Sequence, residues 1–538
     1  MQRFAALLDS LAFQPARNAK LRLMTEYMCT TPDPDRGFAL AALTGTLNLP
    51  NAKPALLREF GVQRLGETLF VLSYDYVGDL AETLALIWQP SDTASAGQNQ
   101  PAPSLSEVVE RLRAASKRET PQLLEQWLDA LDSTGRWALL KLLTRDLRVG
   151  VSARLAKQAI ADLGKRDIVD VEEVWHALQP PYQALFDWIE GRAPRPDPGA
   201  APVFRPLMLA TALEDAELAG LDPAAYRAEW KWDGIRVQLV ATAGHRHIFS
   251  RAAEQATTAF PDIIEIMDFN AVLDGELLVA RPDESGTVHV APFNDLQQRL
   301  NRKQPNPKLL QDYPAHVRLY DALMIDGEDI RALPFDERRT RLEAWYAARP
   351  RPRLDLSPLV HFGTWEELAA IRAGTREAGI EGLMLKRGDS PYVAGRPRGP
   401  WFKWKRAALT ADCVLMYAQR GHGKRSSYYS DYTFGCWRPT NGGTAELVPV
   451  GKAYFGFTDA ELIKLDKWVR DHTTNRFGPV REVEPGLVLE IAFDSIHRST
   501  RHKSGVAMRF PRVHRIRWDK PPEEADELAT LERMIAAP

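Results

Sequence analysis

The pattern of hydrophobic and polar positions changes twice along the chain and predicts three regions. Up to about residue 190, apolar residues recur three and four positions apart, the spacing of amphipathic helices. Beyond residue 206 they form short alternating or continuous runs separated by polar turns, which predicts strands. After about residue 410 such runs dominate again. We therefore expect a helical region, a mixed α/β region and a smaller β region.

The elements of the two later regions follow from these runs. In the middle region, strands are predicted over residues 236–243, 271–280, 317–325 and 381–388. Helices are predicted over residues 336–348 and 365–374. In the last region, strands are predicted over residues 412–419, 432–438, 446–454 and 487–493, with a helix over residues 458–472. In the helical region, Ser104 with Glu107 predicts a capping box, and Thr120 before Pro121 predicts an N-cap.

The boundaries between regions are marked by composition. Residues 192–206, RAPRPDPGAAPVFRP, contain five prolines without periodicity and are interpreted as a linker. Residues 91–104 are interpreted as a loop. The predicted domains are residues 1–195, 205–408 and 410–538. The predicted fold class is multidomain α+β, because 538 residues are too many for one hydrophobic core.

Composition excludes several classes of protein. The 45% of hydrophobic residues supports packed domains. Runs of about 18 apolar residues do not occur, and the segment MQRFAALLDSLAF is too interrupted for a signal peptide, so we expect a soluble cytoplasmic protein without a membrane segment. Cys29, Cys413 and Cys436 are far apart in sequence and form no C-x-x-C pair, which argues against a disulfide framework and a structural zinc site.

The distribution of charge is more informative than its sum. The net charge of −2 does not by itself indicate a nucleic-acid-binding protein. Residues 497–520, HRSTRHKSGVAMRFPRVHRIRWDK, contain many Arg and Lys residues and a single acid, Asp519. Such a stretch binds phosphates even on a neutral protein. A solvated basic face explains the same residues, so both interpretations stay open on charge alone.

The segment AEWKWDGIRVQLV, residues 228–240, places Lys231 between two tryptophans and is interrupted by Gly234. A lysine in apolar surroundings costs free energy unless it is paired or neutralised. Only about 0.1% of free lysine is neutral near pH 7.4, and desolvation and neighbouring cations increase this nucleophilic fraction. The segment is therefore either an ordinary turn between two strands or the site of a reactive lysine.

Cations and carboxylates that could accompany such a lysine occur further along. In WFKWKR, Lys403 and Lys405 are two positions apart and share one face of a strand, although a surface strand with basic residues is the alternative. Asp274 and Glu276 likewise share a strand face, and carboxylates suit Mg²⁺. Glu381 and Lys386 are five positions apart, so a shared site requires strand twist or Glu381 at the strand end.

These segments follow one another in a specific order. KWDGIR is followed by SR, DGE, YD, EGLMLK, WFKWK and RWDK, at residues 231–236, 250–251, 274–276, 320–321, 381–386, 401–405 and 517–520. The series resembles the covalent nucleotidyltransferases, the superfamily of ATP-dependent DNA ligases, RNA ligases and mRNA-capping enzymes. Their signature is K-x-D-G-x-R followed by E-G-x-M-x-K and K-x-K. One K-x-D-G match is common by chance, but the ordered series is not.

The resemblance covers nearly the whole chain and narrows the family. LLTRDLRVGVSARLAKQAI is similar to the DNA-binding domain of larger ATP-dependent DNA ligases of bacterial type, and the basic stretch with PPEEADELATLERM resembles their OB-fold domain. The implied architecture is an all-α DNA-binding domain, an α/β nucleotidyltransferase (ATP-grasp-like) domain and a β-barrel OB-fold domain. SRAAE at 250–254 departs from the commoner family pattern after Arg251, which leaves the main roles in place.

The resemblance implies a role for each matching residue. Lys231 attacks the α-phosphorus of ATP, releases pyrophosphate and forms lysyl-AMP. Glu381 is expected to bind Mg²⁺ or Mn²⁺, and Glu276 the metal or the ribose. The other nucleotide contacts are expected from Glu229 and Tyr320 at adenine, Arg236 and Arg251 at ribose and phosphate, Lys386, Lys403 and Lys405 at the phosphates, and Arg517, Asp519 and Lys520 at pyrophosphate.

In the later steps that the resemblance implies, AMP passes to the 5′-phosphate of a nick and the 3′-hydroxyl displaces it. The expected function is sealing of nicked duplex DNA in repair, replication or recombination by a monomer. Arg148, Arg498, Arg501 and Lys503 are expected to bind the DNA backbone, with all three domains encircling the DNA.

Three alternative functions are disfavoured by the sequence. An RNA ligase or capping enzyme is disfavoured by the helical region and the whole-length resemblance. An NAD-dependent ligase normally carries a four-cysteine zinc element, which three cysteines cannot build. A catalytically silent DNA-binding protein would be favoured by loss of the nucleophile or the metal ligands, yet Lys231, Glu276, Glu381 and Lys405 are all present.

Overall fold

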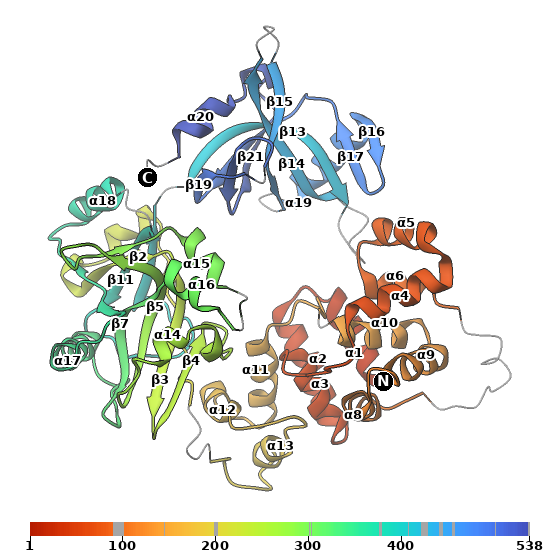
Figure 1. Cartoon of the computed structure of the whole chain (residues 1–538), viewed down its shortest axis with the longest axis horizontal. Coiled ribbons are helices and arrows are strands. Elements are labelled where there is room, and N and C mark those ends of the chain that lie inside the picture. Colours follow the sequence, from red (N-terminus) through yellow and green to blue (C-terminus); the bar gives the residue numbers. More distant parts are fainter. Residues whose placement is uncertain are drawn as a thin grey trace. The chain divides into compact units, whose positions relative to one another are not determined.

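The chain forms two compact units in the computed structural model. Figure 1 shows its helices and strands. One unit contains Met1–Ala159, Pro180–Gln183 and Ala408–Pro538, and the other contains Ile160–Gln179 and Ala184–Ala407. The structure describes residues 1–89, 102–144, 146–197, 203–300, 302, 304–375, 379–406, 408–420, 429–440, 445–454, 458–500 and 502–535. Most of the predicted loop at 91–104 and part of the predicted linker at 192–206 lie outside these residues.

Helices make up the N-terminal region, as its periodicity predicts. They are α1 (Gln2–Phe13), α2 (Arg17–Thr30), α3 (Asp35–Leu43), α4 (Pro54–Leu65), α5 (Glu67–Val77), α6 (Leu80–Ile87), α8 (Leu105–Ala114), α9 (Thr120–Ala130), α10 (Ser133–Thr144), α11 (Ala153–Leu163), α12 (Ile168–Trp175) and α13 (Gln183–Ile189). In α8, for example, Leu105, Val108, Val109 and Leu112 are buried, which is the apolar stripe of an amphipathic helix.

The two predicted helix starts differ in outcome. The side chain of Ser104 accepts a hydrogen bond from the backbone N–H of Glu107, so Ser104 is the N-cap of α8. The prediction that Thr120 caps α9 is wrong, because Thr120 is the first helical residue and Glu119 precedes it as N-cap. The N–H of Thr120 already donates to the carbonyl of Ser116 at 3.1 Å, so helical hydrogen bonding begins before Pro121.

The region between residues 205 and 406 is built on two sheets whose strands pair mostly antiparallel. The five-stranded sheet has the order β1 (Thr211–Ala212), β12 (Trp401–Lys405), β11 (Ile380–Arg387), β2 (Tyr226–Trp232) and β10 (Leu359–Val360). The seven-stranded sheet has the order β4 (His245–Ser250), β3 (Ile235–Thr242), β5 (Ala271–Pro282), β7 (Ala315–Ile325) and β8 (Glu328–Asp329), with β6 (Val288–Val290) beside β5 and β9 (Leu354–Leu356) beside β7.

Helices cover both sheets. Leu342 of α17 (Phe335–Ala348) joins the core of the seven-stranded sheet, and Leu368 of α18 (Trp365–Gly374) joins the core of the five-stranded sheet. The shorter helices of this region are α14 (Pro261–Ile264), α15 (Phe293–Arg299) and α16 (Pro307–Asp312). The chain passes from one sheet to the other at Asp233 and Gly234, between β2 and β3. This crossing places Lys231 where the two sheets meet.

The C-terminal region, from Leu409 onward, consists mainly of β-strands (Figure 1). Its seven-stranded sheet has the order β15 (Ala445–Ala453), β14 (Tyr429–Pro439), β13 (Leu409–Arg420), β17 (Val480–Val483) and β16 (Thr473–Phe477), and β18 (Val488–Phe493) pairs with β13 and with β21 (Arg512–Arg517). The strands β19 (Ser495–Arg498) and β20 (Val506–Arg509) form a separate pair, and the helices are α19 (Asp459–Asp471) and α20 (Leu528–Arg533).

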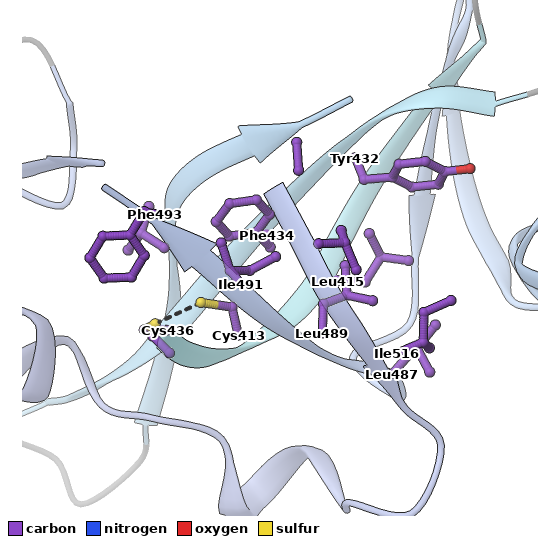
Figure 2. Close-up of a cluster of buried hydrophobic side chains, with 14 of the residues drawn as sticks. Cys413, Leu415, Tyr432, Phe434, Cys436, Leu487, Leu489, Ile491, Phe493 and Ile516 are labelled. Carbon is purple, nitrogen blue, oxygen red and sulfur yellow. Dashed lines mark hydrogen bonds between the residues drawn. The ribbon is translucent and has the colours of Figure 1, made fainter. Parts of the chain in front are cut away.

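The core of this region brings together two cysteines that are 23 positions apart in sequence. Figure 2 shows Cys413 and Cys436 among the buried side chains of Leu415, Phe434 and Ile491. Their Sγ atoms are 3.5 Å apart, and both residues are free cysteines. Their neighbours are apolar side chains, so they contribute to the core.

The expected helical N-terminal region and the β-rich later regions are thus confirmed. In the part of the chain that the structure describes, helices long and apolar enough to cross a membrane are absent.

Candidate active site

Strand pairing places the predicted lysines on one face of the five-stranded sheet. Lys231 of β2 lies opposite Gly382 of β11, and Gly382 lies opposite Lys405 of β12. Two pairs further along, Met384 of β11 lies opposite Lys403. Residues directly opposite one another project to the same side of a sheet. Lys231, Lys403 and Lys405 therefore share a face, as the two-residue spacing in WFKWKR predicts.

A β-bulge brings Glu381 to this face. The pairing of β11 with β2 shifts between Ile380, which lies opposite Trp232, and Gly382, which lies opposite Lys231. Glu381 is the extra residue, so its side chain is released from the strict alternation of the strand. Gly382 has a φ of 149°, and a Cβ there would lie 2.5 Å from the carbonyl oxygen of Trp404. Glycine therefore allows the bulge that the sequence pattern alone leaves open.

Glu381 binds two of the lysines. Its Oε2 forms an ion pair with Nζ of Lys231 and lies 3.5 Å from Nζ of Lys405. Burial raises the pKa of Glu381, but the positive charges of Lys231 and Lys405 outweigh burial and lower the pKa to about 2. The carboxylate is therefore ionised at neutral pH.

The second sheet contributes Glu276 to the same site. Glu276 lies on β5 opposite Arg236 of β3 and is partly buried. Burial raises the pKa of Glu276 to about 8, and the charges of Lys231 and Arg236 only partly offset this effect, while the charge of Glu381 adds to it. The charge of Glu381 thus acts on Glu276, and the charge of Lys231 acts on both carboxylates, although 105 positions separate the two in sequence.

Further cations lie close enough to Lys403 to act on it electrostatically. Partial burial lowers the pKa of Lys403, and the positive charges of Arg396, Lys405, Lys231 and Arg251 lower it further. Arg251 was predicted from the SR motif, whereas Arg396 was missed, because it lies in a loop with only the weak signal of the sequence GRPRG. A cluster of like charges suits an anionic ligand such as a polyphosphate.

Gly234 lets the turn after Lys231 pack tightly against β5. A Cβ at Gly234 would lie 2.5 Å from the carbonyl oxygen of Leu277 and 2.8 Å from Cγ of Glu276. The backbone N–H of Asp233 donates to the carbonyl of Gly379 at 2.6 Å. The glycine of the K-x-D-G motif therefore allows the turn to pack closely against β5, next to the candidate metal ligand Glu276.

Glu229 and Lys386, predicted at adenine and at the phosphates, are paired with each other. Nζ of Lys386 lies 2.9 Å from Oε2 of Glu229, and Arg339 of α17 approaches Oε1 at 3.4 Å. Burial raises the pKa of Glu229, and the charges of Lys386 and Arg339 oppose this rise. Both side chains of the Glu229–Lys386 pair are about 2% exposed. Their roles toward a nucleotide stay predictions.

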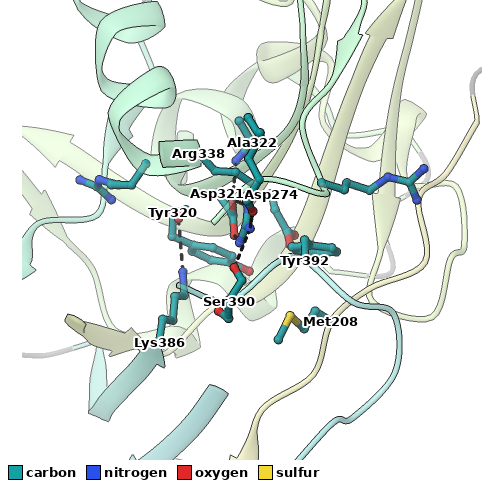
Figure 3. A network of polar contacts seen from close by, with 12 residues as sticks. Met208, Asp274, Tyr320, Asp321, Ala322, Arg338, Lys386, Ser390 and Tyr392 are labelled. Atoms are coloured by element: carbon teal, nitrogen blue, oxygen red, sulfur yellow. Dashed lines mark hydrogen bonds and ion pairs between the residues drawn. The ribbon is translucent and has the colours of Figure 1, made fainter. Parts of the chain in front are cut away.

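Arg236, predicted at the ribose and phosphates, has most of its donors already engaged. Its guanidinium forms a two-pronged ion pair with Asp274, and it donates to the Tyr392 hydroxyl at 3.0 Å and to the Met208 carbonyl at 2.7 Å. The Tyr392 hydroxyl also donates to Asp274 at 2.8 Å (Figure 3). Of the five N–H groups that a guanidinium has, this leaves one beyond the hydrogen bonds named. Asp274 and Tyr392 therefore hold Arg236 in place.

Tyr320 lies above Lys386, as Figure 3 shows. Nζ of Lys386 is 4.6 Å from the centre of the Tyr320 ring and donates to the Tyr320 carbonyl at 3.2 Å. Tyr320 falls in a second register shift, between the pairs Asp274–Asp321 and Gly275–Leu319. Burial raises the pKa of its hydroxyl well above the ordinary value. An aromatic ring here suits a stacked base.

Arg517 and Lys520, which are predicted to contact pyrophosphate, lie in the other unit, and both form ion pairs with Asp412. Nζ of Lys520 lies 2.7 Å from Oδ2 of Asp412, and Nη1 of Arg517 lies 3.3 Å from the same oxygen. Arg517 also pairs with Asp519 at 2.9 Å. Asp412, which the sequence reasoning missed, therefore fixes both cations of the RWDK motif.

Three of the four predicted DNA-binding residues lie in the described part of the chain and are at the surface. Arg148 is 59% exposed in a turn with a φ of 48°, and it pairs with Asp146 at 2.6 Å. Arg498 at the end of β19 is exposed, and Lys503 is 68% exposed and pairs with Glu446 at 3.0 Å. Arg501 lies outside the described residues. Exposure leaves these side chains accessible to a polyanion.

The comparisons with known proteins agree on one class. Residues 207–405 match the ATP dependent DNA ligase domain, and residues 425–520 match the ATP dependent DNA ligase C terminal region. A probable DNA ligase of Koribacter versatilis (strain Ellin345) is 33% identical over 426 residues, which cover 74% of this chain and 71% of that protein. A probable DNA ligase of Anaeromyxobacter sp. (strain Fw109-5) is 34% identical over 460 residues, which cover 83% of this chain and 85% of that protein.

The fold has a counterpart among solved structures. One described as Pmar-Lig_PreS3 covers 96% of this chain and 99% of its own with a TM-score of 0.58, and at 17% identity this likeness shows the fold alone. The matches, together with a site whose charges suit a polyphosphate, define an enzyme that uses ATP to join nucleic-acid ends. The chain belongs to the ATP-dependent DNA ligases, which seal nicks in DNA at the expense of ATP.

Proposed function

We propose that Lys231 is the residue that accepts AMP from ATP. The observation that carries this proposal is the position of Lys231 at the meeting of the two sheets, paired with Glu381 and surrounded by the charges of Lys403 and Lys405. The bond from Nζ of Lys231 to the α-phosphorus forms while the bond from that phosphorus to the pyrophosphate oxygen breaks. The lysine proton leaves to solvent or a nearby base, and the product is lysyl-AMP.

The surrounding cations supply what phosphoryl displacement needs from a protein, which is positioning and charge neutralisation. Lys403 and Lys405 project to the same face as Lys231, and the charges of Arg251 and Arg396 act on Lys403. We assign them to the phosphates of ATP. Tyr320 is assigned to stacking on adenine, Glu229 to adenine recognition, and Arg236, Glu276 and Lys386 to the lining of the nucleoside pocket.

Glu276 and Glu381 fit a magnesium site completed by substrate. Within the described ranges, clusters of three or more His, Cys, Asp or Glu side chains that could hold a metal are absent. Mg²⁺ commonly takes one or two carboxylates with substrate phosphates and water, so two neighbouring carboxylates are an adequate protein contribution. Bound Mg²⁺, or Mn²⁺, would neutralise charge on the phosphates. Ionised Glu381 is the stronger ligand of the two at neutral pH.

The later steps require nicked duplex DNA. AMP passes from Lys231 to the 5′-phosphate, and the 3′-hydroxyl oxygen then bonds to that phosphorus as AMP leaves. We assign residues 1–195 as the helical DNA-binding domain, 205–408 as the nucleotidyltransferase domain and 410–538 as an OB-fold domain. Arg148, Arg498 and Lys503 support DNA binding by their exposure, and Arg517 and Lys520 are assigned to pyrophosphate. The enzyme is proposed to act as a cytoplasmic monomer.

Incubation with α-labelled ATP and Mg²⁺ tests the nucleophile. Wild-type protein should gain label that Lys231→Ala does not. Lys467→Ala is the matched control, because Lys467 is 80% exposed on α19, and it should keep wild-type labelling. Label that persists on Lys231→Ala would refute the assignment. Sealing of nicked DNA but not of nicked RNA duplexes would support DNA as the substrate.

A further inference from the structure

We propose that Arg318 is a positioning residue that acts through Trp232 to hold Lys231 in line with its target, an inference that rests on the proposed role of Lys231. Arg318 and Asp355 lie outside the motifs that identify the family, and Trp232 occupies the variable position of K-x-D-G. The proposal follows from a chain of contacts beneath the nucleophile.

Trp232 is the neighbour of Lys231 and projects from the other face of β2. It is buried and packs with Leu278 of β5 and Ile380 of β11, so its indole joins the two sheets. The indole N–H donates to Oγ of Ser357 at 3.0 Å, and the backbone N–H of Ser357 donates to the carbonyl of Leu319 at 2.7 Å. The ring is therefore held at its edge by the segment after β9.

Arg318 holds the face of the same ring. Its guanidinium carbon lies 4.2 Å from the centre of the Trp232 ring, a distance typical of cation–π stacking. Such contacts contribute most when they are removed from water, and Arg318 is 8% exposed. A buried guanidinium stacked in this way is suited to orient a neighbouring side chain.

The orientation of Arg318 is itself determined by Asp355. Arg318 of β7 and Asp355 of β9 lie opposite each other in register, and Nε and Nη2 of Arg318 donate to the two carboxylate oxygens at 2.9 and 2.6 Å. Nε2 of His316 lies 3.1 Å from Oδ1 of Asp355. A two-pronged pair fixes the plane of the guanidinium, which a lysine ammonium would leave free to rotate.

The consequence for Lys231 is geometric. The backbone on the far side of Trp232 is fixed by the hydrogen bond from Asp233 to Gly379 and by the close packing of Gly234 on β5. With the indole also held, the end of β2 has little freedom to shift Nζ of Lys231. In-line displacement is sensitive to such shifts, since a misplacement of about 1 Å can cost about a hundredfold in rate.

The three steps of the reaction distinguish a residue that positions Lys231 from one that only supports folding. Adenylation of Lys231 and transfer of AMP to DNA make or break a bond at Nζ of Lys231, whereas sealing of pre-adenylated nicked DNA does not. A positioning residue for Lys231 should therefore affect the first two steps and spare the last. A residue that merely supports folding should affect all three to the same extent.

The experiment compares Arg318→Met with Arg299→Met in the full chain. Arg299 is a matched control because it forms a buried ion pair with Asp262 at 2.8 Å in the same region but contacts neither Trp232 nor the lysines through any bond described above. At saturating ATP, Arg318→Met should lower the rate of lysyl-AMP formation by about tenfold or more and leave sealing of pre-adenylated nicked DNA within about twofold. Arg299→Met should change both rates alike.

Two further variants keep the proposal testable if Arg318→Met does not fold. Ser357→Ala removes the hydrogen bond at the edge of the indole. It should slow lysyl-AMP formation but not sealing, and by a smaller factor than Arg318→Met does. Arg318→Lys should restore part of the rate, because an ammonium still carries charge over the ring. Equal losses in both assays, or unchanged lysyl-AMP formation, would overturn the proposal. Persistent labelling of Lys231→Ala would instead refute the nucleophile assignment itself.

Discussion

Nζ of Lys231 and Oε2 of Glu381 form an ion pair across two strands, although 150 positions separate the residues in sequence. The pair exists because β11 carries a bulge at Glu381, next to a glycine whose backbone lies against that of Trp404 and Lys405. A regular strand would have placed Glu381 on the face opposite Lys386. The geometry of this ion pair is therefore a property of the bulge.

Substituting Gly382 with alanine should disturb this bulge. The new Cβ would lie 2.5 Å from the Trp404 carbonyl oxygen, and the φ of 149° is unfavourable for alanine, so we expect a loss of about 1–3 kcal/mol of unfolding free energy. Lysyl-AMP formation should fall by about tenfold as Glu381 moves. Urea unfolding and α-labelled ATP measure the two effects.

The control for Gly382→Ala is Gly374→Ala, at the last residue of α18. A Cβ at Gly374 has nothing within 4 Å. Its effect should stay within about 1 kcal/mol and should leave labelling unchanged. Wild-type labelling by Gly382→Ala would contradict the importance of the bulge.

Glu276 should make the stability of the nucleotide-free and metal-free protein fall as pH rises. Its pKa is raised to about 8 in the folded state, so between an ordinary pKa near 4.5 and about 8 the folded state binds more protons than the unfolded state. The free energy of unfolding therefore decreases with pH through this window and levels off above it. Glu276→Gln should remove this decline.

Thermal unfolding from pH 5 to pH 9 checks the prediction for Glu276. As the pH increases from about 5 to about 8, the Tm of Glu276→Gln should increase relative to that of wild type. Glu366→Gln, a change at an exposed glutamate of α18, should show no such trend. A Tm difference that is independent of pH would mean that Glu276 is not a carboxyl with a raised pKa.

Removing one partner of the Arg338–Asp321 pair should destabilise the protein strongly. Their side chains are fully buried and joined by two hydrogen bonds of 2.9 Å, part of the network in Figure 3. Removing one partner leaves an uncompensated buried charge, so Arg338→Leu should cost about 3–5 kcal/mol in urea unfolding. Arg341→Leu, on the same helix at 36% exposure, should cost at most about 1 kcal/mol.

Lys386 and Lys403 should respond differently to replacement by methionine. Lys386 is paired with buried Glu229, so Lys386→Met should cost about 3–5 kcal/mol of unfolding free energy. Lys403 lies in the cation cluster, so Lys403→Met should raise the KM for ATP while changing stability by less than about 1 kcal/mol. Urea unfolding and the ATP dependence of labelling distinguish them. A stable Lys386→Met variant would show that Glu229 has sufficient partners without Lys386.

Much of the fold could be predicted because helix and strand periodicity is local. The helices predicted over 336–348 and 365–374 appear as α17 (Phe335–Ala348) and α18 (Trp365–Gly374), and the strand over 271–280 lies within β5 (Ala271–Pro282). The shared face of Lys403 and Lys405 likewise follows from a two-residue repeat. The family was predictable because several short motifs occur in a set order, which a single sequence displays directly.

What the sequence by itself determined, then, is the set of elements, the family and the candidate residues. Only the tertiary structure decided their partners. The bulge at Glu381, the engagement of Arg236 by Asp274 and Tyr392, and the stacking of Arg318 on Trp232 all depend on strand register and on contacts between distant segments. Periodicity assigns the residues of a strand to its two faces, but it does not say which distant strand will pair with it, where a bulge will fall or which side chains will meet across the pairing.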